Sequence, residues 1–496
     1  MGLIFTRERI AGSPHMKEIW TYITRRWNDE CGYRRILVMA FPLILSTSAW
    51  AIQHFVDRMF LTWHSPEAIA ASMPAGMLSF TIMSLFIGTA NYVTTFVAQY
   101  HGAGRDDRIG PSVWQGIYVA LIAGVVHLLF IPAAAPFFQW VGHGETIQEM
   151  ETIYFQILCL GALPQVASGA FSGFFAGRGK TSPVMWVNIA AMAVNLILDY
   201  ALIFGHFGFP ALGVKGAAIA TALAPCASCA IFLILLAPPR YEKKYRTLSG
   251  WRLDIPLFAR IMRYGLPNGM GFLIEMIGFT AFILLVGRLG TIELAATNVA
   301  FNINNLAFLP MIGFGTTISI LVGQSLGRDR VDLATRSVYS GAHLTFFYMI
   351  SIAAAYAFIP GLFLWPFAAQ ADATAFAPIR EMSVVLLKFV AAYCFFDTMN
   401  IIFSAGIKGA GDTRFAMYLG ISYSIFGLAI PTYIILGPLG MGIYAAWTVI
   451  TLNICLLGLI FFARFLGGKW KEMRVIEATH PTIHYPAPGK QDRGTL

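Results

Sequence analysis

Apolar segments recur along the whole chain and are separated by short polar or glycine-rich connections. Twelve of them are long enough to cross a bilayer as α-helices. These segments lack the polar face that a helix needs at the surface of a soluble domain. The pattern therefore predicts an all-α integral membrane protein with twelve transmembrane helices, at residues 35–63, 70–100, 112–135, 150–175, 183–205, 213–237, 259–287, 293–325, 337–364, 379–407, 415–436 and 441–465.

The second half of the chain repeats the first, at offsets of 225 to 232 residues. Aligned pairs include Pro42 and Pro267, Gly88 and Gly313, Gln99 and Gln324, Gly102 and Gly327, and Gly177 and Gly409. Each repeat holds six spans, so both repeats start on the same side of the membrane. This predicts two six-helix lobes related by a pseudo-two-fold axis along the membrane normal. A substrate cleft is expected between such lobes, near the midplane.

The repeat also sets the expected domain boundaries. They are an N-tail (1–34), an N-lobe (35–238), a linker (239–258), a C-lobe (259–465) and a C-tail (466–496). The C-tail carries Pro, His and Lys without periodicity, and we expect it to be disordered.

Composition and charge agree with a membrane protein. The mean hydropathy is +0.66, and only 12% of residues are charged. All but five of the 34 Lys and Arg lie in the tails or in connections on the same side as the N-terminus. The net charge of +9 therefore indicates topology, with both termini in the cytoplasm, and not nucleic-acid binding. A bacterial inner membrane and a monomer are expected.

Four acidic residues interrupt the apolar segments: Asp57, Asp199, Glu275 and Asp397. A carboxylate in the bilayer costs at least about 2.5–3.5 kcal/mol on insertion scales, so each is a candidate functional residue. None of the four has an acidic partner in the other repeat. The repeated fold therefore does not require them, and a function in binding cations becomes the hypothesis.

The N-lobe acids belong to a set of oxygen-bearing groups. Asn195 and Asp199 are four residues apart on one span, Ala217 and Thr221 are four apart on the next, and Asp57 is expected at a similar depth. Such a set suits a hard cation, with a possible contribution from a loosened carbonyl at Ala217. Two neighbouring carboxylates could equally share a proton. A structural hydrogen-bonded cluster between helices is the alternative.

The C-lobe offers a second set. Glu275 and Asp397 could form another acidic pair, and Tyr393, one turn before Asp397, could present its ring or hydroxyl to a cation. Asn298 and Asn302 are four apart on the eighth span. Acidic walls with methionine and aromatic side chains suit lipophilic organic cations. The candidate lining residues are Met73, Met77, Phe80, Phe301, Tyr393 and Asn298, and Asn302 is a candidate for binding the cation or the substrate.

These residues resemble those of the multidrug and toxic compound extrusion (MATE) family, over about residues 34–465. The connection Gly409-Ala-Gly-Asp-Thr-Arg414 and the pair Val97-Ala-Gln99 and Val322-Gly-Gln324 carry the resemblance. Phe55-Val-Asp57, Asn195-Leu-Ile-Leu-Asp199 and Gly216-Ala-Ala-Ile-Ala-Thr221 look like its N-lobe cation site. Glu275 and Asp397 look like the acidic pair of its NorM-type branch. Arg58 and Lys180 depart from the family pattern.

The resemblance implies antiport, in which Na⁺ or H⁺ enters while a cationic, amphipathic drug leaves, by alternating access of V-shaped lobes. It implies that Asp57, Asn195, Asp199, Ala217 and Thr221 hold the coupling ion, and that Glu275, Asn302, Tyr393 and Asp397 hold a second ion or the drug. No cofactor beyond the coupling ion is expected. A flippase for a lipid-linked saccharide or cell-wall precursor is the alternative, although its anionic substrate would favour a basic cavity. The sequence carries no enzyme motif such as Gly-x-Ser-x-Gly or a phosphate loop.

Overall fold

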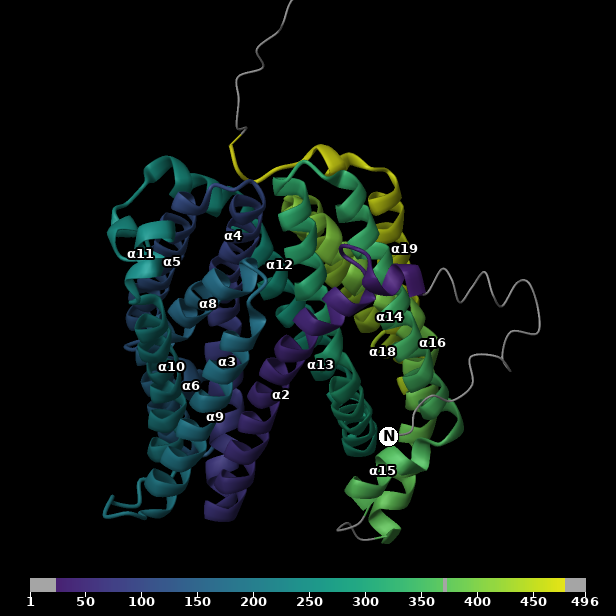
Figure 1. Ribbon diagram of the computed structural model, residues 1–496. Coiled ribbons are helices and arrows are strands. Elements are labelled where there is room, and N and C mark those ends of the chain that lie inside the picture. Colours follow the sequence, from purple (N-terminus) through teal and green to yellow (C-terminus); the bar gives the residue numbers. More distant parts are fainter. Residues whose placement is uncertain (1–23, 369–372, 478–496) are drawn as a thin grey trace, which may run out of the picture.

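The computed structural model describes residues 24–368 and 373–477, and within these ranges the chain forms helices and no strand (Figure 1). Among the described residues, eleven helices are long and apolar enough to cross a membrane, and a bent pair of shorter helices makes up a twelfth span. The predicted all-α membrane fold is therefore confirmed. The parts of the predicted tails at 1–23 and 478–496 lie outside the described residues.

The N-lobe begins with a long helix and continues through eight more helices. Two of its spans are broken, one at Tyr92 and the other at Gly161. At Gly161 the chain bends by 41°. The helices are α2 (Tyr33–His64), α3 (Pro66–Asn91), α4 (Val93–Gly102), α5 (Ile109–Phe130), α6 (Ala134–Val141), α7 (Glu145–Leu160), α8 (Ala162–Gly177), α9 (Thr181–Phe204) and α10 (Val214–Leu236). A short 3₁₀ turn, η1 (Asp106–Arg108), precedes α5.

The linker forms α11 (Pro239–Tyr245) and a 3₁₀ turn, η2 (Ser249–Trp251), before the C-lobe begins. In the C-lobe the two spans that are broken in the N-lobe are continuous, whereas the span equivalent to α9 contains a π-helix. The elements are α12 (Ile255–Gly287), α13 (Thr291–Gly327), α14 (Val331–Phe358), α15 (Pro360–Ala368), α16 (Ala373–Ala410), α17 (Thr413–Ser422), the π-helix η3 (Tyr423–Ala429), α18 (Ile430–Leu436) and α19 (Ile443–Leu466).

Local sequence explains where several helices begin and end. The Ser65 hydroxyl accepts a hydrogen bond from the Ala68 N–H, and Pro66 follows at the first helical position of α3. Asp254 caps α12 in the same way by accepting from the Leu257 N–H at 3.0 Å. Gly205, with φ of +76°, ends α9 in the left-handed conformation that favours glycine.

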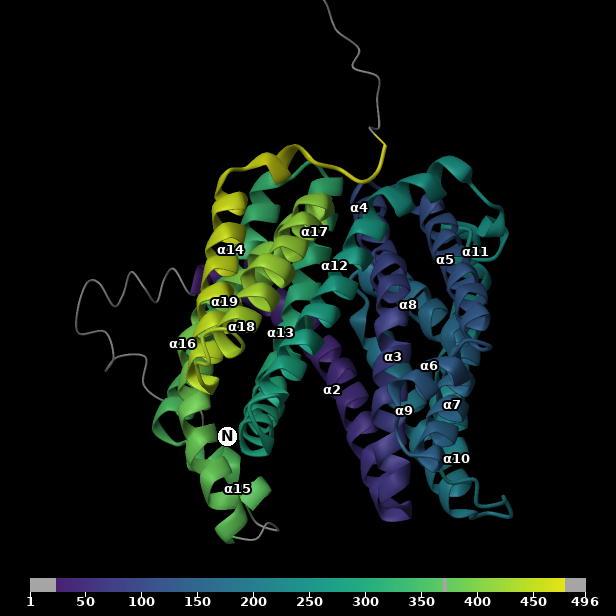
Figure 2. The same cartoon turned by 180° about the vertical axis from the view of Figure 1, so that it is seen from behind.

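Two ends of the bundle differ in charge and in packing. We call the end that carries residues 103–108, 237–254 and 467–477 the basic end, and the end that carries residues 205–213 and α15 the open end. The two lobes lie side by side at the basic end and diverge toward the open end, which gives the molecule a V shape (Figures 1 and 2). The helices α2 and α13 pack together, as do α3 and α12, and join the lobes.

The repeat seen in the sequence reappears in the contacts between the lobes. The Gln99 side-chain amide donates to the Gly409 carbonyl at 3.0 Å, and that of Gln324 donates to the Gly177 carbonyl at 2.7 Å. Both the donors and the acceptors are pairs of repeat equivalents. Each lobe therefore holds the other through the same hydrogen bond, which agrees with a pseudo-two-fold relation.

Glycines allow the helices to come this close. A Cβ atom at Gly102 would lie 2.1 Å from the Gln324 carbonyl oxygen, and one at Gly327 would lie 2.1 Å from the Gln99 carbonyl oxygen. Any side chain at either position would collide with the backbone of the other lobe. The conformation with lobes joined at the basic end therefore requires both glycines.

The described part of the C-tail is ordered, contrary to the disorder predicted for residues 466–496. Residues 467–477 cross the basic end after α19 and contain a 3₁₀ turn, η4 (Lys469–Glu472). Trp470 is 1% exposed and stacks on Phe465, with ring centroids 5.0 Å apart. The prediction failed because this segment is stabilised by contacts with distant helices, which a search for periodicity cannot detect.

Candidate functional site

The N-lobe acids meet inside the bundle, between α2 and α9. Asp57 is 5% exposed, and Asn195 and Asp199 are fully buried. The Asn195 side chain, oriented with its NH₂ group toward the acids, donates to Asp57 Oδ1 at 2.9 Å and to Asp199 Oδ2 at 3.2 Å. The two carboxyl groups also interact with each other. The predicted juxtaposition of these three residues is therefore what the structure shows.

This arrangement follows from helix periodicity and close packing. Asn195 and Asp199 lie one turn apart on α9 and share the face that packs along α2. Two residues that the sequence analysis missed complete that side of α2. His54 Nδ1 lies 3.9 Å from Asp57 Oδ2, and Gln53 lies beside Asn195. Their spacing of three and four residues from Asp57 could have indicated them.

Two oxygen atoms at this site have no partner. Asp199 Oδ1 and Thr221 Oγ1 are buried, and neither makes a hydrogen bond with the described part of the chain. Buried polar atoms are nearly always hydrogen-bonded, so each of these two oxygens marks a place for an additional donor or a cation. A proton or a small cation would satisfy these oxygens.

The predicted loosening of α10 falls at a different residue. The helix runs from Val214 to Leu236 without a break at Ala217, which is buried at 1% exposure. Pro225, inside α10, has no N–H group to donate to the carbonyl four residues earlier. The carbonyl that this frees is that of Thr221, so Thr221 offers both a hydroxyl and a carbonyl oxygen.

Arg58 lies on another side of α2. Its side chain is exposed, and no ion pair joins it to Asp57. This agrees with the rotation of about 100° between consecutive residues of a helix. The structure therefore favours a guanidinium that extends away from the site over one that neutralises Asp57.

A buried carboxyl group on α7, that of Glu151, was not predicted from the sequence. Glu151 is fully buried, its Oε1 lies 2.8 Å from His143 Nδ1, and its Oε2 has no partner among the described residues. One turn further on, Tyr154 is 7% exposed and interacts electrostatically with Asp57 and Asp199. The polar region therefore continues from the acid pair toward the loop that carries His143.

The second acidic pair lies between α12, α16 and the π-helix η3. Asp397 is 8% exposed and accepts a hydrogen bond from Asn400 at 3.4 Å, whereas the Glu275 side chain is exposed. The two acids interact electrostatically with each other and with Tyr423, the first residue of η3. Tyr393, one turn before Asp397, is 2% exposed. Glu275, Tyr393 and Asp397 of the predicted C-lobe set therefore lie in one region together with Tyr423, whereas nothing in the described part of the chain joins Asn302 to them.

An aromatic cluster fills the place in the C-lobe that the acid pair occupies in the N-lobe. Phe282 is the repeat equivalent of Asp57, and it packs against Phe301 with ring centroids 6.1 Å apart. Phe301, half-buried, stacks on Trp447 at 5.0 Å. The polar site is therefore specific to the N-lobe, and Phe301 contributes to the packing of the C-lobe.

The other predicted lining residues lie where the lobes diverge. Met73 and Met77 on α3 are exposed, and the next residue on this face, Phe80, contacts Phe272 of α12 with ring centroids 6.0 Å apart. Their repeat equivalents on α13, Asn298 and Asn302, are also exposed, and the Asn302 amide donates to the Asn298 carbonyl. The four side chains therefore occupy equivalent positions in the two repeats and are all exposed.

Within the described ranges, no three His, Cys, Asp or Glu side chains converge as they would around a transition metal. Two carboxylates and a hydroxyl form a set of oxygen groups that suits a proton or an alkali cation, and the Asn195 amide, which donates to both acids, holds the carboxylates in place. The site can therefore bind and release a small cation inside the bundle.

Comparisons with known proteins identify the family of the chain. A family model described as MatE matches residues 42–201 and 267–435, more than half of the chain. A probable multidrug resistance protein NorM from Xylella fastidiosa is 29% identical over 458 residues, which cover 91% of this chain and 94% of that protein. One from Shewanella oneidensis is 26% identical over 442 residues, with coverages of 87% and 94%.

Solved structures share the fold at lower sequence identity. The outward-facing conformation of a multidrug resistance MATE family transporter of the MOP superfamily matches with a TM-score of 0.80 and 19% identity, covering 90% of this chain and 98% of that one. A MOP superfamily transporter from Pyrococcus furiosus, described as having a binding pocket of reverse polarity, matches with a TM-score of 0.78 and 19% identity, with coverages of 89% and 97%.

Proposed function

The chain belongs to the MatE family of membrane transporters, and we propose that it is a cation-coupled antiporter that exports lipophilic organic cations. As a member of this family it is a transporter and not an enzyme. The names of its relatives as multidrug resistance proteins support the class of substrate. We propose that a single copy acts in a bacterial inner membrane, with the basic end in the cytoplasm, since Lys and Arg favour that side.

One observation carries the proposal. Asp57, Asn195 and Asp199 converge in the N-lobe, and oxygens of Asp199 and Thr221 are left without partners. An unsatisfied acidic site inside a membrane bundle is costly, so its retention calls for a ligand that comes and goes. In the proposed mechanism this ligand is Na⁺ or H⁺, held by oxygens of Asp57, Asp199 and Thr221, while Asn195 positions the two acids and Ala217 belongs to the same site.

Coupling would follow from differential affinity. An ion at the N-lobe site favours one arrangement of the lobes and a bound drug favours the other, so that each promotes release of its competitor. We assign the drug to the region between the lobes, where Met73, Met77, Asn298 and Asn302 are exposed. Glu275, Asp397 and Tyr393 would provide negative charge and an aromatic ring for its cationic group or for a second ion.

The test is efflux of ethidium from proteoliposomes under an imposed Na⁺ gradient and, separately, an imposed pH gradient. We expect Asp199→Asn and Asp397→Asn each to reduce ion-driven efflux by about tenfold or more, the equivalent of about 1.4 kcal/mol in one step. Asp107→Asn, at an exposed carboxylate in the α4–α5 connection, is the matched control and should leave efflux unchanged. If ion-driven efflux is unchanged in both Asp199→Asn and Asp397→Asn, the proposed mechanism is wrong.

A further inference from the structure

The end of the described chain connects the two lobes. We call residues 467–477 the strap. It leaves α19 of the C-lobe through Gly468, whose φ is +73°, and crosses the basic end to the N-lobe (Figure 1). Trp470 and Val475 are each 1% exposed, so the strap is anchored by burial of apolar side chains as well as by polar contacts.

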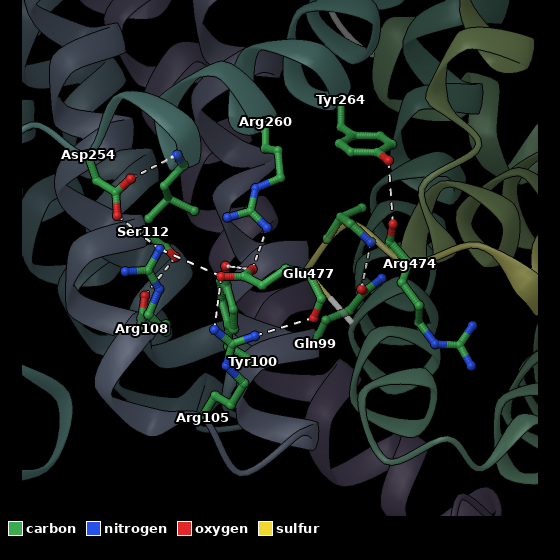
Figure 3. Close-up of polar contacts among 12 residues, drawn as sticks. Gln99, Tyr100, Arg105, Arg108, Ser112, Asp254, Arg260, Tyr264, Arg474 and Glu477 are labelled. Atoms are coloured by element: carbon green, nitrogen blue, oxygen red, sulfur yellow. Dashed lines mark hydrogen bonds and ion pairs between the residues drawn. The ribbon is translucent and has the colours of Figure 1, made fainter. Parts of the chain in front are cut away.

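The middle of the strap lies on the contact between the lobes. The Val475 N–H donates to Gln99 Oε1 at 2.9 Å, while Gln99 Nε2 donates to the Gly409 carbonyl. The Tyr264 hydroxyl donates to the Arg474 carbonyl at 3.4 Å (Figure 3). The strap therefore adds to one of the two symmetric glutamine contacts, and it does so through backbone groups that any sequence could provide.

The last described residue provides the specific contact. The Glu477 carboxylate lies among three guanidinium groups and a phenol hydroxyl (Figure 3). Arg105 Nη2 is 2.9 Å from Oε1, Arg108 Nη2 is 3.8 Å from Oε1, and Tyr100 Oη donates to Oε2 at 2.7 Å. Arg260 also donates to Oε2, and Arg105 Nη1 donates to the Glu477 carbonyl at 3.3 Å.

These arginines come from both lobes. Arg105 and Arg108 follow α4 in the N-lobe, whereas Arg260 lies in the first turns of α12 in the C-lobe. Asp254 pairs with Arg108 at 2.9 Å but reaches only that one of the three. Without the Glu477 carboxylate, neighbouring positive charges from the two lobes would repel each other at close range. With it, the same charges attract a shared partner.

We propose that Arg105, Arg108 and Arg260 form a carboxylate-binding site whose ligand is Glu477 of the same chain, and that the strap, bound there, holds the lobes together at the basic end. The strap leaves this site when the lobes separate at that end. The proposal goes beyond the export function, because it depends neither on the coupling ion nor on the exported substrate.

Partial exposure makes this binding reversible. The three arginine side chains are 23–24% exposed and that of Glu477 is 36% exposed, so water can solvate each charge once the strap leaves. Charge-assisted hydrogen bonds stabilise such a contact without the large desolvation cost that a fully buried pair carries. The strap is therefore suited to repeated binding and release, in contrast to the fully packed glycine contacts beneath it.

The test measures the distance between the lobes at the basic end in the full-length protein in nanodiscs. Spin labels are placed at Lys180→Cys and Arg414→Cys, which are exposed positions in the two lobes, after the six native cysteines are replaced. We expect Glu477→Gln to raise the ratio of separated to joined lobes about three- to tenfold, as loss of a charged hydrogen-bond partner implies. A stop codon after Gly468, which removes residues 469–477 of the strap and all that follow, should have at least this effect.

Two controls make the outcome decisive. Glu472→Gln changes an exposed acid of the same strap, and a stop codon after His480 removes only later residues without placing a terminal carboxylate on Glu477, so both should match the parent protein. Unchanged distances in Glu477→Gln would overturn the proposal, and its isosteric side chain avoids a folding defect. The two proposals can fail separately. If Glu477→Gln changes the distance between the lobes but the parent protein shows no ion-driven efflux, the strap proposal stands and the export function is rejected.

Discussion

The unpartnered Thr221 hydroxyl distinguishes the two ions that the N-lobe site could bind. Because it makes no hydrogen bond with the described residues, Thr221→Val removes a buried polar atom without removing a contact. We expect unchanged or slightly higher thermal stability in the absence of Na⁺. If Na⁺ is the coupling ion, its affinity should fall by about tenfold with the loss of one oxygen ligand. Stabilisation by Na⁺, measured as a shift in the unfolding midpoint, checks this.

The same experiment has a second informative outcome. Proton coupling requires the carboxylates but no hydroxyl ligand. In that case Thr221→Val should retain efflux driven by a pH gradient, and Na⁺ should not change the unfolding midpoint of either protein. A variant that loses efflux under both gradients while remaining folded would contradict both assignments of this hydroxyl.

Asn195 is the residue on which the geometry of the acid pair depends. Its amide donates to both Asp57 and Asp199, so Asn195→Leu, of similar size, leaves two carboxyl groups without a donor. Each unsatisfied buried group costs about 1–3 kcal/mol, and we expect a lower unfolding midpoint together with loss of ion-driven efflux. Asn304→Leu, at an asparagine outside both sites, is the control. An unaltered midpoint in Asn195→Leu would show that these hydrogen bonds contribute little.

Some residues of the N-lobe site can be predicted from the sequence and others cannot, depending on the residue type. A carboxylate in an apolar helix is improbable enough to be noticed, so Asp57 and Asp199 were predicted. His54 and Glu151 were missed, because a histidine or an acid near the end of a span is common in membrane proteins. Their significance comes from a partner in space, Asp57 for one and His143 for the other. The free carbonyl belongs to Thr221 and not to Ala217, because it is set by the missing N–H of Pro225 four residues later.

At the scale of elements, the contact between α4 and α13 yields a steric prediction. A Cβ at Gly102 would lie 2.1 Å from a backbone oxygen of α13, and no rotamer change can relieve that collision. Gly102→Ala should therefore move the lobes apart at the basic end, at a cost of about 1–3 kcal/mol to the joined conformation. The spin-label distance between Lys180→Cys and Arg414→Cys checks this.

A second glycine provides the control for this substitution. At Gly420, in α17, a Cβ would have no heavy atom of another residue within 4 Å among the described part of the chain. Gly420→Ala should therefore be neutral or stabilising by about 0.5–1 kcal/mol, through the better helix propensity of alanine. Equal distance distributions in the two variants would show that the close approach at Gly102 does not fix the conformation.

Hydrophobic pattern identified the spans, and the spacing of repeated residues identified the lobes, because both follow from constraints that act along the chain. The breaks did not follow. The same pattern of apolar residues gives a bend at Gly161 and a continuous helix at its equivalent, Tyr393, because bending depends on packing around the helix. The π-helix at Tyr423–Ala429 was likewise not predicted, since one extra residue per turn leaves no distinct sequence signature.

At the scale of the whole molecule, the strap makes the closure of the basic end depend on charge. Burial alone would raise the pKa of Glu477, but hydrogen bonds from Arg260 and Tyr100 outweigh it and hold the pKa of Glu477 well below its usual range. The charged groups around it are Arg105, Arg108 and Arg260, with Asp254 beside Arg108. Glu477 is therefore ionised throughout the pH range of a living cytoplasm, and the strap does not act as a sensor of neutral pH.

The sign of the pH effect follows from this depressed pKa. A carboxylate that is more acidic in the joined conformation than in the free strap stabilises that conformation fully above the ordinary glutamate pKa of about 4.3, and this contribution is lost as the pH falls below it. The difference in lobe separation between the parent protein and Glu477→Gln should thus be constant from about pH 8 to about pH 5 and shrink below about pH 4. Added salt should weaken it at any pH, because the charges are partly exposed. The opposite result would be a difference in lobe separation that grows on acidification or does not change with ionic strength. It would mean that burial of Trp470 and Val475 holds the strap in place and that the Glu477 contact contributes little.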